Sequence, residues 1–298
     1  MKIRTLIACL GLFAVTASFA QTSEFLGELR GMKHRQKGYS YQGMDVWKDY
    51  VFSCQNHGAV TIYKLKKDGF KEVSQFKLAS FRPENHANVA SFGPDFFEKG
   101  DPMPIVYVSH CSKMRIDGRK DLLFVERVAK NMRSSELLQT IFYDDVNGDF
   151  GYALQWVVDK ENRMLYGYGN TINNTDPANR HRIIKFRLPE LTEGKFVVLR
   201  PEDALENYLI EDVSRFRFNP VGQDLAIEDG KLYMPTGVGD DKYPSILYIW
   251  DLKKKKMEVV DLVKITHSEF EGIGILKGKG KGRQVLIQSQ DGLYRITL

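Results

Sequence analysis

The chain repeats one arrangement of short β-strands five times, and this repetition limits the folds open to it. In each repeat a half-apolar strand precedes a strongly apolar strand, a polar loop, a third apolar strand and usually a fourth. The runs are rich in β-branched and aromatic residues and lack a clear 3.6-residue period, which indicates an all-β fold. We expect first strands at 42–46, 86–92, 152–158, 223–227 and 271–275, second strands at 50–54, 105–111, 164–170, 231–237 and 284–290, and third strands at 59–65, 122–128, 182–188, 246–252 and 292–298.

The last repeat lacks a fourth strand, whereas a spare strand lies near the start of the chain. Fourth strands fit 72–78, 137–143, a stretch near 196–210, and 257–263. Leu298 ends a third strand, and the segment 24–30 has the pattern of the missing one. An N-terminal strand that completes the last sheet closes a ring of sheets and protects its edges.

Five four-stranded repeats closed in this way resemble a five-bladed β-propeller. The resemblance covers nearly all of residues 21–298 and implies one propeller domain. The repeats begin 44, 66, 71 and 48 residues apart, so six blades are the alternative if a long unit hides a further repeat. A twisted β-sandwich would not explain a missing strand at one end of the chain and an extra one at the other.

Residues 1–20 have the pattern of a secretory signal peptide. Lys2 and Arg4 precede an apolar run over 6–17, and Ser18 and Ala20 are the small residues expected before cleavage at Gln21. The run is too short to span a membrane, and no later stretch has about 18 uninterrupted apolar residues. We therefore expect a mature protein of residues 21–298 that is secreted or periplasmic and has no transmembrane segment.

Charge and motifs exclude several function classes. Loss of Lys2 and Arg4 with the signal peptide lowers the formal net charge from +5 to +3, too mild a balance to favour nucleic acid. The chain has no P-loop, dinucleotide fingerprint or HExxH motif, so we expect no cofactor and no metal. A small-molecule or glycan ligand and a monomeric protein are the remaining expectations.

The candidate binding residues lie at one end of the predicted channel. In an up-and-down blade, the start of strand 1 and the loop between strands 2 and 3 share one face. Amides and imidazoles offer both donors and acceptors, which suits a polyhydroxyl ligand, an amide or a peptide. The same groups could instead connect neighbouring blades through backbone hydrogen bonds or channel waters. The candidates are Gln42, His57, His86, Asn88, His110, Tyr152, Asn170, Gln223, Asp224 and Gln288.

Binding of a glycan or similar polar ligand is the favoured function, with two alternatives. One is an enzyme in which Glu271 acts as acid/base. Resemblance to arabinanase-like propeller glycosidases would place Glu271, Asp224 and Asp45 on inner strands, as glycoside hydrolysis needs paired carboxylates. The pairs Gln42-Gly43 and Glu271-Gly272 resemble the inner strands of plant-type glutaminyl cyclases. The other alternative is a scaffold for a partner protein.

Two further features bear on the choice. His86-Ala87-Asn88 resembles propellers of phage receptor-binding and teichoic-acid-related proteins, which implies contact with cell-surface glycans.

Cys54 and Cys111 both end second strands of consecutive blades, so they could form a disulfide or could each be a small buried side chain.

Overall fold

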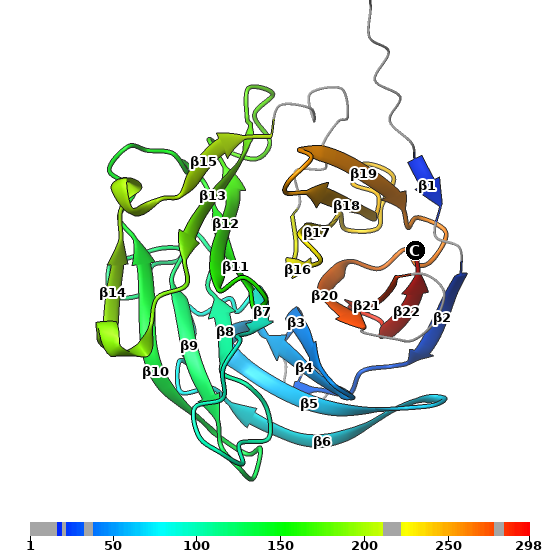
Figure 1. Ribbon diagram of the computed structural model, residues 1–298. Helices are drawn as coiled ribbons and strands as arrows, with labels where there is room; N and C mark the ends of the chain where they lie inside the picture. The colour runs from blue at the N-terminus through cyan, green and yellow to red at the C-terminus, as the bar shows by residue number, and fades with distance from the viewer. Residues whose placement is uncertain (1–16, 20–21, 33–37, 211–221, 277–282) are drawn as a thin grey trace, which may run out of the picture.

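The computed structural model describes residues 17–19, 22–32, 38–210, 222–276 and 283–298, whose strands form five small sheets arranged in a ring (Figure 1). The chain is a five-bladed β-propeller, as the repeats predict. Among these residues, no helix combines the length and the apolar character needed to cross a membrane.

Each blade has four antiparallel strands in chain order from the axis outward. Three single 3-10 turns lie between strands, at Asn56–Gly58, Leu191–Glu193 and Pro201–Asp203. The strands of blade 1 are β3 (Tyr41–Trp47), β4 (Tyr50–Gln55), β5 (Ala59–Lys66) and β6 (Gly69–Lys77); those of blade 2 are β7 (Val89–Phe92), β8 (Val106–Ser109), β9 (Leu123–Val128) and β10 (Ser135–Tyr143); those of blade 3 are β11 (Leu154–Asp159), β12 (Met164–Asn170), β13 (His181–Arg187) and β15 (Glu206–Leu209); those of blade 4 are β16 (Ala226–Glu228), β17 (Lys231–Thr236), β18 (Ile246–Asp251) and β19 (Lys256–Asp261); and those of blade 5 are β20 (Phe270–Leu276), β21 (Gln284–Ser289), β22 (Leu293–Thr297) and the N-terminal β2 (Thr22–Gly27).

The N-terminal strand closes blade 5, as predicted. β2 pairs antiparallel with β22, from Thr22 opposite Thr297 to Gly27 opposite Leu293, and begins two residues before the expected start. A three-residue strand, β1 (Ala17–Phe19), adds in parallel to β19 at the outer edge of blade 4. Apart from β1, the predicted signal peptide lies outside the described residues.

The stretch near 196–210 differs from the single fourth strand that we expected. It holds two short strands that join different blades. β14 (Phe196–Leu199) pairs in parallel with β10 of blade 2, and only β15 completes blade 3. The 3-10 turn at Pro201–Asp203 separates the two strands, so one connection fastens two neighbouring blades together.

Apolar side chains between the blades form the core, because each sheet buries both faces against its neighbours. Between blades 2 and 3, Trp156 is fully buried and packs against Tyr143 and Phe186. Its indole N–H donates to the carbonyl of Asp121 at 2.9 Å, which satisfies its polar atom.

Glycines let the inner strands of blades 5, 1 and 2 approach closely. A Cβ on Gly272 would lie 2.7 Å from Cβ of Met44, and one on Gly43 would lie 2.6 Å from the backbone of Val89 and Ala90. No larger side chain fits at either contact. The glycines of the Gln-Gly and Glu-Gly pairs are therefore explained by packing.

Polar side chains on or beside the inner strands bridge all five blade junctions. An inner strand has one edge without a strand partner, so its backbone groups need other partners. Asp45 accepts from the backbone N–H of Phe92 at 2.7 Å, and Ser91 accepts from that of Val158 at 3.2 Å. The remaining bridges are Gln155 to the carbonyl of Gln223, Asp224 to the N–H groups of Met44 at 2.9 Å and Ile273 at 2.8 Å, and Gln288 to the carbonyl of Gln42 at 2.6 Å.

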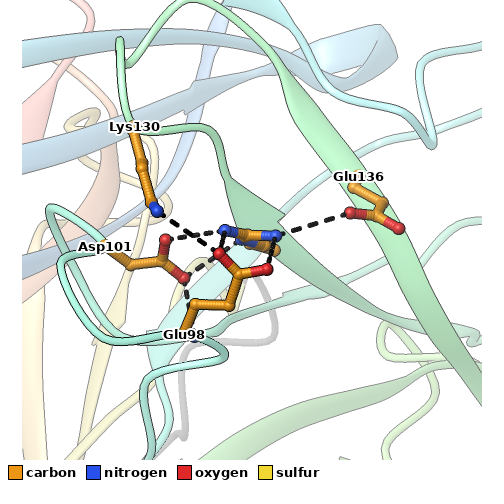
Figure 2. A network of polar contacts seen from close by, with 5 residues as sticks. Glu98, Asp101, Lys130 and Glu136 are labelled. Atoms are coloured by element: carbon orange, nitrogen blue, oxygen red, sulfur yellow. Dashed lines mark hydrogen bonds and ion pairs between the residues drawn. The ribbon is translucent and has the colours of Figure 1, made fainter.

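A network of ion pairs fixes the loop between β7 and β8 at the end of the ring where first strands finish (Figure 2). The Arg127 guanidinium lies 2.7 Å from Glu98 and 2.9 Å from Asp101, and Glu136 lies 4.0 Å away. Lys130 adds a contact of 3.4 Å to Glu98. The network attaches the loop to β9 and has no part in the opposite end of the channel.

We expect removal of β2 to abolish cooperative folding, because the β22 edge and the blade 5 core would both lose their cover. A chain beginning at residue 28 should show no single thermal unfolding transition by circular dichroism. A chain beginning at Gln21, which lacks only β1 and the residues before it, is the matched control and should melt like the full chain. Equal melting of both truncated chains would contradict the closing role of β2.

Asp224→Ala should lower the free energy of unfolding by about 3 kcal/mol or more. Three buried N–H groups, those of Met44, Leu225 and Ile273, each lose their partner at a cost of about 1 kcal/mol or more. Urea denaturation measures the change. Asp68→Ala in the exposed β5–β6 turn is the control, and its effect should stay within about 0.5 kcal/mol.

Candidate functional site

A cavity of about 340 Å³ lies where the first strands of blades 2, 3 and 4 begin. It is displaced from the axis toward these three blades. Its volume is at the lower end of the range of small-molecule sites. The lining residues are His86, Asn88, Cys111, Ser112 and Lys113 of blade 2, Tyr152, Ala153, Gln155, Tyr168, Gly169, Asn170, Asn174 and His181 of blade 3, and Gly222 and Gln223 before blade 4.

Five of the ten predicted binding residues line this cavity: His86, Asn88, Tyr152, Asn170 and Gln223. They come from starts of first strands and from the end of β12, the positions that the repeat pattern assigns to one end of the channel. The structure thus brings together residues that are up to 137 positions apart in the sequence.

Two histidines of blade 2, His86 and His110, are joined by a hydrogen bond. The Nδ1 atom of His110 accepts from the backbone N–H of His86 at 3.1 Å, and its Nε2 lies 3.0 Å from the carbonyl of Met114. These contacts assign the proton of a neutral His110 to Nε2. His110 is therefore a support behind the wall, whereas the His86 ring forms part of the wall and makes no hydrogen bond within the described residues.

Burial keeps the imidazoles of this region uncharged. It lowers the pKa of His86 to about 4, and the neighbouring His110 and His57 act in the same direction. Burial also lowers the pKa of His181 to about 4 and lowers that of His110. A neutral imidazole offers one donor and one acceptor, so His86 can bond a ligand in either sense.

Amide side chains divide their groups between the wall and the cavity. Asn88 uses Oδ1 to accept from the backbone N–H of Cys111 at 2.8 Å, and its side chain also contacts the Cys111 thiol, so Asn88 is bound to the wall. Gln155 uses Nε2 for its bridge to Gln223, which leaves Oε1. Asn170 uses Oδ1 to accept from Asn179 at 2.7 Å, which leaves Nδ2. One amide donor, from Asn170, and one amide acceptor, from Gln155, are thus available to a ligand.

Aromatic rings form the side of the cavity that belongs to blade 3. Tyr152 is half-buried, and Nζ of Lys113 lies 5.3 Å from its ring centroid. Deeper in the wall, the Tyr168 hydroxyl lies 2.8 Å from Nδ1 of His181, and the two rings are parallel within 7°. Tyr152 is the aromatic surface on which a ligand ring could stack.

The other predicted binding residues lie elsewhere. Gln42, Asp224 and Gln288 take part in the blade-to-blade bridges. Burial raises the pKa of Asp224, although three backbone donors oppose that effect. His57 packs edge-on against Tyr39 and places Nδ1 2.7 Å from the carbonyl of Pro83.

The carboxylates proposed for catalysis are also outside the cavity. Glu271 is 5% exposed and accepts a hydrogen bond from the Gln290 amide. Asp45 and Asp224 accept from backbone N–H groups of neighbouring blades. No carboxylate occurs among the residues that line the cavity.

Cys54 and Cys111 are free thiols in the structure, so the disulfide considered from the sequence is not formed here. Cys54 is buried in the core between blades 1 and 2. Cys111 lines the cavity, and burial raises the pKa of its thiol well above the ordinary value. A thiol held protonated is a weak nucleophile, so neither residue has the character of a catalytic cysteine.

Sequence reasoning missed two notable lining residues, His181 and Lys113. His181 is the first residue of the third strand of blade 3, and Lys113 follows the second strand of blade 2. Both positions belong to the same end of the channel. Extending the search to the first residue of each third strand, and to the charged residues of each loop, would have found them.

Among the described residues, one cluster of three carboxylates that could hold a metal ion lies away from the cavity. Glu161, Glu228 and Asp229 have carboxylate oxygens within 4.8 Å of one another. They lie at the β11–β12 and β16–β17 turns, at the end of the ring opposite the cavity, and Lys160 is 4.0 Å from Glu228. This group is separate from the candidate site.

Comparison with solved structures finds the same architecture in distant proteins. The tail fiber of Staphylococcus aureus phage P68 superposes with a TM-score of 0.54 and 12% identity over 93% of this chain, which spans 52% of the tail-fiber chain. The glutaminyl cyclase of Myxococcus xanthus superposes with a TM-score of 0.52 and 13% identity, covering 93% of this chain and 95% of the cyclase. These similarities show the propeller fold. No protein-family profile and no curated protein sequence matches the chain.

The imidazole resonances of His86 and His181 should titrate with midpoints near pH 4. Because the unfolded chain binds these protons near pH 6.5, the contribution of each ring to stability is full above that pH and is lost as the pH falls toward 4. For the buried His181 the loss is about 3 kcal/mol, and for the more exposed His86 it is less. Heteronuclear NMR measures the midpoints. A midpoint near pH 6.5 for His181 would contradict the claim that burial keeps its imidazole neutral.

Proposed function

We propose that the protein is a secreted, ligand-binding propeller that holds a glycan or similar polar ligand in the cavity between blades 2, 3 and 4. The observation that carries the proposal is the set of hydrogen-bonding groups left unpaired around this cavity. His86, Gln155 and Asn170 supply donors and acceptors to a space with the volume of a small-molecule site.

The cavity has groups that could contact both the ring face and the hydroxyls of a sugar. A sugar ring has apolar C–H faces and polar edges, so it needs an aromatic surface beside amide and imidazole groups. Tyr152 offers the surface, and the amides of Gln155 and Asn170 line the same cavity. Because hydrogen bonds to the backbone fix the side chains of Asn88 and Gln155, these two lose little conformational entropy when a ligand binds.

Binding is favoured over glycoside hydrolysis. Hydrolysis needs two carboxylates flanking the scissile bond, about 5–9.5 Å apart. Glu271 and Asp224 are buried and Asp45 is half-buried, and each accepts a hydrogen bond from the protein itself. The cavity wall contributes amides and imidazoles. The two structural neighbours, one named a tail fiber and the other a glutaminyl cyclase, share only the fold with this chain. The choice between binding and hydrolysis therefore rests on the residues of the site.

A thermal-shift screen of the folded protein against mono- and oligosaccharides tests the proposal. A ligand that binds only the native state raises the melting temperature by mass action. His86→Ala and Tyr152→Ala should each reduce affinity for the identified sugar about tenfold or more, since each removes one hydrogen-bonding or stacking contact. His267→Ala, at an exposed loop position, is the control and should bind like the wild type.

Absence of any shift across neutral and acidic sugars would contradict the proposal and favour the partner-scaffold alternative. A shift that persists unchanged in both His86→Ala and Tyr152→Ala would place the binding site outside the cavity.

A further inference from the structure

We propose that the sugar recognised by this cavity is anionic and that its acidic group pairs with Lys113. This inference rests on the proposed function and narrows its ligand class. It follows from the sign of the charge at the cavity, from the position of the one charged side chain in its lining, and from the nature of the neutral groups around it.

The lining of the cavity has a single ordinary cation and no anion. Lys113 is the only Lys or Arg among the lining residues, and they include no Asp or Glu. Carboxylates behind the wall have cationic or amide neighbours: Glu269 accepts from Nε2 of Gln223 at 2.9 Å, and Asp121 lies 3.6 Å from Lys120. A cavity with this balance attracts an anion more strongly than a neutral or cationic molecule of the same shape.

The loop that carries Lys113 strengthens this field. Residues 111–121 hold Lys113, Arg115, Arg119 and Lys120 against two acids. Both acids already have cationic neighbours, because Asp117 lies 3.3 Å from Arg82 and Asp121 lies 3.6 Å from Lys120. Lys113 itself is exposed and forms no ion pair with any residue that the structure describes, so its charge is available to a ligand.

Lys113 is placed at the stacking surface. Its ammonium group lies 5.3 Å from the Tyr152 centroid, close enough for a cation–π contact. A neutral sugar that stacked on Tyr152 would displace this cation without replacing its contact. An acidic group on the sugar would instead receive the displaced ammonium as a charge-assisted donor, so the exchange favours the acidic ligand.

Neutral groups complete the recognition of the rest of the ring. The amide donor of Asn170, the amide acceptor of Gln155 and the uncharged His86 ring can bond hydroxyls without adding further charge. The site thus combines one charge contact with several hydroxyl contacts. That combination fits a monosaccharide unit with one acidic substituent, either a carboxylate or a phosphate.

Isothermal titration of matched sugars tests the inference, with glucose against glucuronate, galactose against galacturonate, and glucose 6-phosphate as the phosphate arm. We expect at least one acidic sugar to bind about tenfold more tightly than its neutral counterpart, with a preference that weakens as salt is added. Lys113→Met keeps the apolar stem and removes the charge. It should abolish the preference by lowering affinity for the acidic sugar, while affinity for the neutral sugar stays equal or rises, since no cation is then displaced from Tyr152.

Lys253→Met, on an exposed turn of blade 4, is the control lysine and should keep the full preference. Equal affinity for neutral and acidic sugars in the wild type would overturn the inference and leave the proposed function standing. Equal loss of both affinities in Lys113→Met would assign Lys113 to the support of Tyr152 and would also overturn it. Failure of every sugar to bind would contradict the proposed function itself.

Discussion

The bonds across the blade junctions at the axis are the constraint on which the rest of this propeller depends. Each inner strand has a sheet partner on one side only, and its remaining backbone groups are buried where water has little access. A polar side chain from the neighbouring blade satisfies them at every junction, through Asp45, Ser91, Gln155, Asp224 and Gln288. Because an unpaired buried amide costs about 1–3 kcal/mol, these bridges stabilise the register between neighbouring blades.

The same constraint explains why the cavity lies to one side. Blades 5, 1 and 2 meet through glycines so closely that Gly43 and Gly272 leave no space for a Cβ. The cavity lies where the inner strands of blades 2, 3 and 4 begin: β7 at Val89, β11 at Leu154 and β16 at Ala226. The residues just before them are irregular, and their side chains line a space instead of pairing along a strand. Gln155 belongs to both regions, with one amide atom in a bridge and the other available at the cavity.

The sequence was sufficient for the architecture because a propeller is a local repeat, and strand pattern and turn spacing are local properties. It gave the closing strand and the end of the channel where polar groups gather. It could not separate bridging residues from cavity residues, since Gln42 and Gln223, or Asp224 and Asn88, occupy equivalent places in the pattern. What separates them is whether a backbone group of the adjacent blade lies within hydrogen-bonding distance. That depends on the distance between the blades. The transfer of β14 to blade 2 was also hidden, because Phe196–Leu199 has the pattern of any edge strand.

The neutral state of the imidazoles has a consequence for selectivity. If His86 were protonated, it would be a donor only, and its charge would dominate a site of this size. Desolvation holds its pKa near 4, so the ring keeps an acceptor that can recognise a hydroxyl proton. A site built from paired donors and acceptors discriminates strongly against an analogue that lacks one hydroxyl, because a polar wall group is then left unpaired. Shape and hydroxyl pattern would therefore be determined by the amides and His86, while the lysine at the rim would determine charge.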